Sequence, residues 1–196
     1  MIERALSFLV KRLDENLRAK FKLTEEIAVA RPPVGSDGKA PADAKNRLIL
    51  FLASISQDSM ARSKVGRVPV VSGRFAVNQT PIHLSLDLIM AASFEAENYA
   101  EGLKILSHGI QFFQVNPSFS PINAPDLDPG ISQLSLEMNN MTPDIANQVW
   151  GLFGGRYLPS VRYQMRTVTI DGNALAAENF AIADPNLTLQ PAESHL

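Results

Sequence analysis

The sequence predicts an α+β fold in a single domain, with a sheet of about five strands and about three helices packed against it. Two patterns predict this class: apolar residues recur every three or four positions in some segments and alternate with polar residues in others. A chain of 196 residues, 45% of them hydrophobic, can bury one core but is short for two domains. We therefore expect a domain over residues 1–171, a projecting loop or hairpin arm at 57–79, and an extended acidic tail at 172–196.

The first third of the chain predicts one helix and two strands. Isoleucine and leucine recur at helical spacing over residues 2 to 20, which indicates an amphipathic helix lying on a core. A short strand is expected at 24–30, ended by the prolines that follow. Residues 32–44 have no periodicity, so we expect an exposed loop that contributes nothing to the core. The apolar run at 47–56 predicts a strand buried on both faces at the centre of the sheet.

The middle of the chain predicts a long insertion, two strands and a helix. Residues 57–79 are too many for an ordinary loop in a compact domain, which favours an arm. Strict alternation at 81–90 indicates a strand with one face on the core. A second helix is expected at about 98–116, because Pro117 forbids its continuation. Alternation at 134–138 indicates a further strand.

The stretch from Thr142 to Asp171 predicts the last helix and the last strand. Thr142 is a suitable N-cap, and Pro143 suits the first helical position because its missing N–H is not needed there. Gly154 and Gly155 can take the positive φ that commonly ends a helix. The apolar face expected for this helix comprises Ile145, Val149 and Leu152, with Trp150 and Phe153 beside it.

The strand expected at 160–170 changes parity along its length. Alternate residues from Val161 to Met165 are apolar on one face, whereas Val168 and Ile170 fall on the opposite face. Either a bulge re-aims the strand, or its second half is covered on both faces, for example by a neighbouring subunit.

The sequence contains no signature of a common catalytic, cofactor or metal site. It lacks G-x-S-x-G, G-x-x-x-x-G-K-[ST] and H-E-x-x-H motifs, and His83 and His108 are interpreted as structural or surface residues. The absence of cysteine excludes disulfides and thiolate chemistry and fits synthesis in the cytosol. Residues 126–130 are interpreted as a turn, because a calcium loop would need more oxygen ligands. We therefore expect no enzyme, no cofactor and no metal.

Charge is distributed unevenly, although the net charge is only −2. Residues 59–86 hold four basic and no acidic residues, whereas 171–196 hold four acidic residues and no lysine or arginine. No aromatic residue is interleaved with the basic ones, and no apolar run is long enough to span a bilayer, so we expect neither nucleic acid nor membrane as a partner. Either the acidic tail of one subunit lies along the basic arm of a neighbour, or both are solvated loops of opposite sign.

Three segments resemble a known family: PIHLSLDLIMAASF, NYAEGLKILSHGIQFFQVNPSF, and ISQLSLEMNNMTPDIANQVWGLFGGRYLPSVRYQMRTVTID. They are similar to the tail-terminator or tube-cap proteins of extracellular contractile injection systems of the antifeeding-prophage and virulence-cassette type. The resemblance extends from the first helix to Asp171 and implies a mixed sheet flanked by helices, as in phage tail terminators. It implies a structural cap, made in the bacterial cytoplasm, that joins a particle which can be released from the cell.

The resemblance also implies partners, namely further copies of the chain in a ring of six and the subunits of the inner tube or sheath. An adaptor between tube or sheath and another cap component is the alternative function, and an unrecognised enzyme is a third. A closed ring needs a heterologous interface, in which two different patches meet. The interface residues expected are Arg62, Lys64, Arg67, Arg74, Arg156, Tyr157, Arg162, Arg166, Glu178, Asp184 and Glu193.

Overall fold

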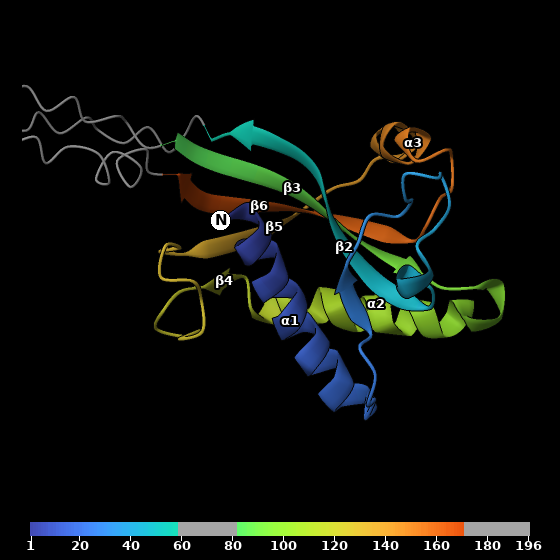
Figure 1. Cartoon of the computed structure of the whole chain (residues 1–196), viewed down its shortest axis with the longest axis horizontal. Coiled ribbons are helices and arrows are strands. Elements are labelled where there is room, and N and C mark those ends of the chain that lie inside the picture. Colours follow the sequence, from blue (N-terminus) through green and yellow to red (C-terminus); the bar gives the residue numbers. More distant parts are fainter. Residues whose placement is uncertain (59–81, 171–196) are drawn as a thin grey trace, which may run out of the picture.

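A mixed sheet of six strands forms the centre of the structure, in the order β1-β2-β3-β6-β5-β4 (Figure 1). The structure is a computed structural model that describes residues 1–58 and 82–170. β1 pairs with β2 in parallel, and the other pairings of the described strands are antiparallel. The strands are β1 (Ala28–Ala30), β2 (Arg47–Gln57), β3 (Ile82–Ser93), β4 (Ser118–Phe119), β5 (Leu134–Asn139) and β6 (Ser160–Ile170). The helices are α1 (Ile2–Phe21), α2 (Tyr99–Val115) and α3 (Pro143–Leu152), with short 3-10 turns η1 (Ala42–Ala44) and η2 (Ala96–Asn98). The predicted α+β class is confirmed.

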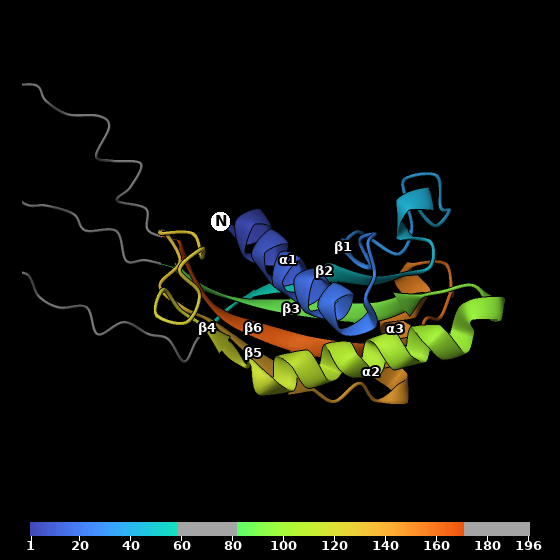
Figure 2. The same cartoon turned by 90° about the horizontal axis from the view of Figure 1, so that it is seen from below.

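Helices α1 and α2 cover one face of the sheet, and α3 lies on the other. Figure 2 shows α1 and α2 in front of the strands and α3 behind them. Leu9 and Leu13 of α1 pack with Leu48, Leu88 and other inward residues of the strands in the main core. On α2, a Cβ at position 109 would meet the Met90 sulfur at 3.0 Å, so Gly109 lets this helix approach β3 closely. The buried faces of these two helices therefore form the larger of two hydrophobic clusters in the described residues.

Helix α3 begins and ends as its sequence predicts. The Thr142 hydroxyl accepts a hydrogen bond from the Ile145 amide, and Pro143 occupies the first helical turn. Gly154 and Gly155 have φ values of 73° and 75°, and the Gly155 amide donates to the Trp150 carbonyl at 2.9 Å. The glycine pair is therefore a helix stop.

Two bulges interrupt the regular pairing of β3 with its two neighbours, β2 and β6. On β6, Met165 pairs with Leu86 and Val168 with Leu84, so β6 has one more residue than β3 between these two pairs. On β2, residues 52 and 54 pair with neighbouring residues of β3, which leaves Ala53 as the extra residue. The parity change predicted in the last strand is therefore explained by a bulge, the first of the two alternatives.

Three expectations about the fold are wrong. Ala44 is buried against the α3 side of the sheet, so the loop over 32–44 does contribute to the core. β2 lies second from one edge, whereas β3 and β6 are central, and its second half from Ala53 is exposed rather than buried. Leu152 is 82% exposed, because α3 turns its Trp150 side to the sheet. The two-residue strand β4 brings the sheet to six strands, in agreement with the prediction of about five.

Tyr163 carries a hydroxyl that is buried without a hydrogen-bond partner among the described residues. Burial raises the pKa of this phenol to about 12. Tyr163→Phe should therefore leave the free energy of unfolding unchanged or raise it by up to about 1 kcal/mol. Because the folded pKa is the higher one, wild-type stability should decline as the pH rises from about 10 toward 12, and the decline should be smaller in the variant. Urea unfolding at several pH values measures both effects, and a marked loss of stability in the variant would contradict them.

Candidate functional site

The α3 side of the sheet is only partly covered, and its uncovered area is polar. Helix α3 shields the end of the sheet around Ile49, Phe51 and Ile89, where a second, smaller core includes Trp150 and Leu158. Beyond α3, polar side chains of β2, β3, β5 and β6 lie next to one another. We call this area the polar sheet face, and its residues are Ser54, Ser85, Asp87, Glu137, Asn139, Arg162, Gln164 and Arg166.

At the α3 end of the polar sheet face, the Asp87 carboxylate has two hydrogen-bonding partners. The Arg162 guanidinium donates from Nε and Nη2 to the two oxygens of Asp87, at 3.2 and 2.9 Å. The Ser54 hydroxyl donates to the same carboxylate at 2.7 Å. The side chains of Asp87 and Arg162 are only 17% and 26% exposed, so this fork-shaped pair is shielded from water. Three strands are thereby joined by side chains as well as by their backbones.

A second network continues across the face toward β5. The Gln164 amide donates to the Ser85 hydroxyl at 2.8 Å and accepts from the Arg166 guanidinium at 3.2 Å. Arg166 also lies 3.3 Å from a carboxylate oxygen of Glu137, which is largely exposed. The two acidic and two basic groups of the polar sheet face thus neutralise each other, which makes this area a poor site for a small ionic ligand.

A groove of about 280 Å³ separates the polar sheet face from α3. Ser54, Asp87 and Arg162 line its floor, and apolar side chains of α3 line its wall. Among the latter, Leu152 is almost fully exposed. An apolar ridge beside a neutralised polar floor resembles the core and rim of a protein–protein interface more than the lining of an active site.

The predicted residues Arg156 and Tyr157 lie after the helix stop, on the outside of this region. Tyr157 is 64% exposed, and its ring stacks edge to face against Trp150 with the centroids 6.1 Å apart. Arg156 is exposed and lines a second hollow together with Lys45 and Glu95. The structure therefore brings Arg156 and Tyr157 near one end of α3, while Arg162 and Arg166 lie on the polar sheet face with partners of their own.

Seven of the predicted interface residues lie outside the described part of the chain. They are Arg62, Lys64, Arg67, Arg74, Glu178, Asp184 and Glu193. The idea that the acidic tail meets a basic arm thus stays a prediction. Asp87, Glu137 and Gln164 were not predicted, although the strict alternation at 81–90 puts Asp87 on the polar side of its strand.

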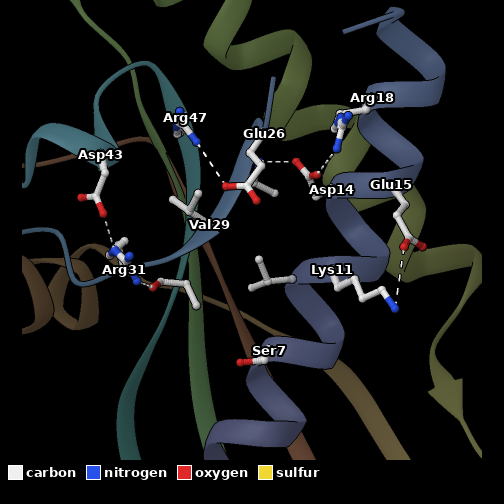
Figure 3. Close-up of a pocket in the computed structure, with 13 residues that line it drawn as sticks. Ser7, Lys11, Asp14, Glu15, Arg18, Glu26, Val29, Arg31, Asp43 and Arg47 are labelled. Carbon is white, nitrogen blue, oxygen red and sulfur yellow. Dashed lines mark hydrogen bonds and ion pairs between the residues drawn. The ribbon is translucent and has the colours of Figure 1, made fainter. Parts of the chain in front are cut away.

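A further pocket lies on the opposite side, between α1 and the edge strand β1 (Figure 3). It has a volume of about 400 Å³ and many charged residues, most of which are paired. Arg31 donates to Asp43 at 2.6 Å, and this hydrogen bond holds the pKa of the Asp43 carboxyl below its ordinary value. Arg47 lies 3.6 Å from Glu26. The charges of this pocket therefore hold β1 and its neighbouring loop in place.

Asp14 is the most constrained residue of this pocket. One of its carboxylate oxygens accepts hydrogen bonds from the backbone amides of Ile27 and Ala28, at 2.7 and 3.0 Å. Its other oxygen lies 3.5 Å from Arg18, one helical turn further along. Asp14 is buried, so it connects α1 to the start of β1 and is not available as a general base.

The turn at 126–130 also uses its acidic residues for structure. Asp128 accepts hydrogen bonds from Arg4 at 2.7 Å and from the Gly130 amide at 2.8 Å. Asp126 pairs with Arg12 and Lys11 of α1. The interpretation of this segment as a turn is confirmed, because its carboxylates bind α1.

Within residues 1–58 and 82–170, no group of three or more metal-ligating side chains is arranged to hold an ion. No helix of the same residues is long and apolar enough to cross a bilayer.

Comparison with known proteins places the chain in a family. The family model described as the Pvc16 N-terminal domain matches residues 5–182. No curated protein matches by sequence. Two cryo-EM structures share the fold: the anti-feeding prophage cap (AFP tube terminating cap), with a TM-score of 0.53 and 14% identity, and the PVC sheath/tube terminator in the extended state, with 0.50 and 12%.

These alignments cover nearly the whole of this chain but only part of the longer ones. They include 97% and 96% of this chain, and 58% and 63% of the cap and the terminator. The chain thus spans somewhat less than two thirds of each of these solved chains. Because the family model covers most of the sequence and the structures share its fold, the chain belongs to the Pvc16 N-terminal domain family.

Proposed function

We propose that the protein is a structural subunit that ends the tube, or the tube and the sheath, of a contractile injection particle. The match to the Pvc16 N-terminal domain over residues 5–182 is the observation that carries this proposal. The fold supports it, because both solved structures that share it are described as terminators or terminating caps. The chemistry of the site supports a non-catalytic role as well, since Asp87 pairs with Arg162, and Arg166 pairs with Gln164 and Glu137.

In this proposal, six copies of the subunit form a closed homo-oligomeric ring. A tube end is a ring of repeated sites, and a cap with the same rotational symmetry meets every site with the same contacts. The exposed apolar and aromatic residues at the end of α3, Leu152 and Tyr157, supply the centre of the contact between copies, with Arg156 at its rim.

Mass photometry of the purified full chain tests the oligomer. We expect a species of about six times the 21.4 kDa chain mass, and rotational symmetry in negative-stain images. Tyr157→Asp should weaken the assembly at least tenfold, because it places a charge where an exposed aromatic side chain would be buried. Ile122→Asp is the matched control, since Ile122 is 94% exposed and lies in the turn that follows β4, outside the proposed contact.

Binding to purified tube and sheath subunits tests the partner. A capped tube of defined length, with the protein at its end, is the expected result. A monomer that assembles only on tube or sheath protein would replace the ring with the adaptor function. A monomer that binds neither would overturn the proposed function.

A further inference from the structure

Strand β2 has a free edge over the second half of its length. β3 pairs with β2 from Arg47 to Gln57, but β1 covers the other side only at Leu48 to Leu50. No strand of the described residues pairs with that side at 52–57. Figure 1 shows β2 continuing past the short strand β1 toward the end of the sheet that lies away from α3.

The backbone of this edge is directed outward at alternate residues. The Leu48 amide donates to Ile27 of the β1 segment at 2.8 Å, and the Asp58 amide donates to His83 of β3 at 2.9 Å. In an antiparallel pair, every second residue of β2 forms backbone hydrogen bonds with β3, and the residues between them point outward. The bulge at Ala53 shifts this alternation by one residue. The N–H and C=O groups of Ile55 and Gln57 therefore point away from β3.

The side chains do not protect this edge. From residue 48 to residue 57 the sequence is LILFLASISQ, with no charged residue and no proline. Edge strands of monomeric proteins are normally guarded by lysine, proline or a covering loop, because an open row of amides accepts another strand. Residues 53–57 are exposed, and Ile55 is 52% exposed. Apart from the bulge at Ala53, the described part of the edge is ready for strand addition.

We propose that an extended stretch of the C-terminal residues 172–196 of a second copy adds to the free edge of β2. The inference rests on the homo-oligomer of the proposed function and names one of its contacts. Each copy then donates one tail and accepts one, which is the heterologous pattern that a closed ring needs.

The position at which the tail leaves the sheet favours this occupant. β6 ends at Ile170, which pairs with Ile82 of β3, and Gln57 pairs with Leu84 of the same strand. The free edge and the start of the tail therefore lie at the same end of the sheet, about 10 Å apart across two strand spacings. A chain of this length reaches roughly 80 Å when extended, which is enough to arrive at a neighbouring copy.

Composition and charge favour the tail as well. The tail contains the short apolar sequence FAI at 180–182 and the alternating sequence LTL at 187–189, both of which suit a strand. The tail is acidic, and the free edge presents no charge that would repel it. The four basic residues at 59–86, which are expected to attract the tail, directly follow β2 in the sequence.

Disulfide trapping tests the contact directly, because the chain has no cysteine of its own. One full-length chain carries Gln57→Cys, and a second chain, with a larger purification tag, carries Thr188→Cys. After mixing and mild oxidation we expect a disulfide-linked dimer of the two different chains. Gln148→Cys, at an exposed position on α3, replaces Gln57→Cys in the control and should not form this dimer.

A proline at the edge tests the need for strand pairing. Ile55→Pro removes an outward amide without removing a β2–β3 hydrogen bond, so the melting temperature should change by only a few degrees. The mass of the assembly should fall toward that of the monomer at concentrations where the wild type is a ring, with an affinity at least tenfold lower. Ile55→Thr keeps the amide and a β-branched side chain, and should assemble as the wild type does.

The outcomes separate this contact from the cap function. Intact rings with Ile55→Pro, or after truncation behind Gly172, would overturn the inference and leave the cap standing. In a further variant that carries Gln57→Cys and Thr188→Cys in the same chain, a disulfide that forms only within that chain would also overturn it. If Ile55→Pro abolished binding to tube or sheath but spared the ring, the occupant would be a particle subunit and not the tail. A wild type that remains monomeric and binds neither tube nor sheath would refute both proposals.

Discussion

Replacing Trp150 with alanine is expected to destabilise the protein by about 3–5 kcal/mol, which is the usual cost of deleting a buried aromatic side chain. Trp150 is the buried residue of α3 and is 3% exposed. Its ring packs edge to face with Phe51 of β2, with the centroids 6.2 Å apart. A ten-residue helix has little stability of its own, so α3 depends on this anchor. Urea unfolding followed by far-ultraviolet circular dichroism measures the loss.

Trp150→Phe is the matched control for the anchor. The indole N–H has no hydrogen-bond partner among the described residues, so phenylalanine loses buried area without breaking a hydrogen bond. We expect about half of the alanine effect or less. Trp150→Ala should also reduce ring formation, because Leu152 and Tyr157 are positioned through α3. A variant with wild-type stability would mean that Val149 and Phe153 suffice to hold the helix.

Replacing Asp14 with alanine is expected to cost about 2–4 kcal/mol, because it leaves two backbone amides without an acceptor. These amides belong to Ile27 and Ala28, and Ala28 is only 3% exposed. The ion pair with Arg18 adds little, since the arginine is 38% exposed and its nitrogen lies 3.5 Å from the carboxylate. The expected loss therefore comes from hydrogen bonds rather than from charge.

Asp14→Asn separates these two contributions. The asparagine oxygen can still accept from both amides, whereas the negative charge is gone, so a loss of about 1 kcal/mol or less is expected. Hydrogen exchange at Ile27 and Ala28 should be faster in Asp14→Ala and nearly unchanged in Asp14→Asn. Equal losses of stability in the two variants would show that charge, and not the amide bonds, is what Asp14 contributes.

The features that local sequence determines were predicted well. The helical repeats gave α1 and α2 to within about two residues. The Thr142 cap and the two glycines marked both ends of α3, because capping depends on a few adjacent residues. The bulge before Val168 is visible in the sequence as a change of parity, since one extra residue inverts the alternation of a strand.

The features that depend on distant residues were not predicted. Ala44 is buried although its loop is polar, because it packs with Ile49 and other residues on the α3 side of the sheet. The exposure of Leu152 depends on which side of α3 faces the sheet, and the larger Trp150 decides this. The alternation of apolar residues from Val161 to Met165 implies the opposite face for Arg162, but its partner Asp87 is 75 positions away in the chain. Helical and strand periodicities contain no information about such pairs.

The central pairing of β3 with β6 has a consequence for the rate of folding. It joins Ile82 to Ile170 and Ala91 to Ser160, so the middle of the sheet closes only after a long stretch of chain has been ordered. Sheets built from such distant contacts fold slowly, in milliseconds to seconds. Until β6 arrives, β3 presents a second open edge beside that of β2, and strands of different chains can pair there in the wrong register. Refolding at low protein concentration should therefore give a higher yield of native subunits.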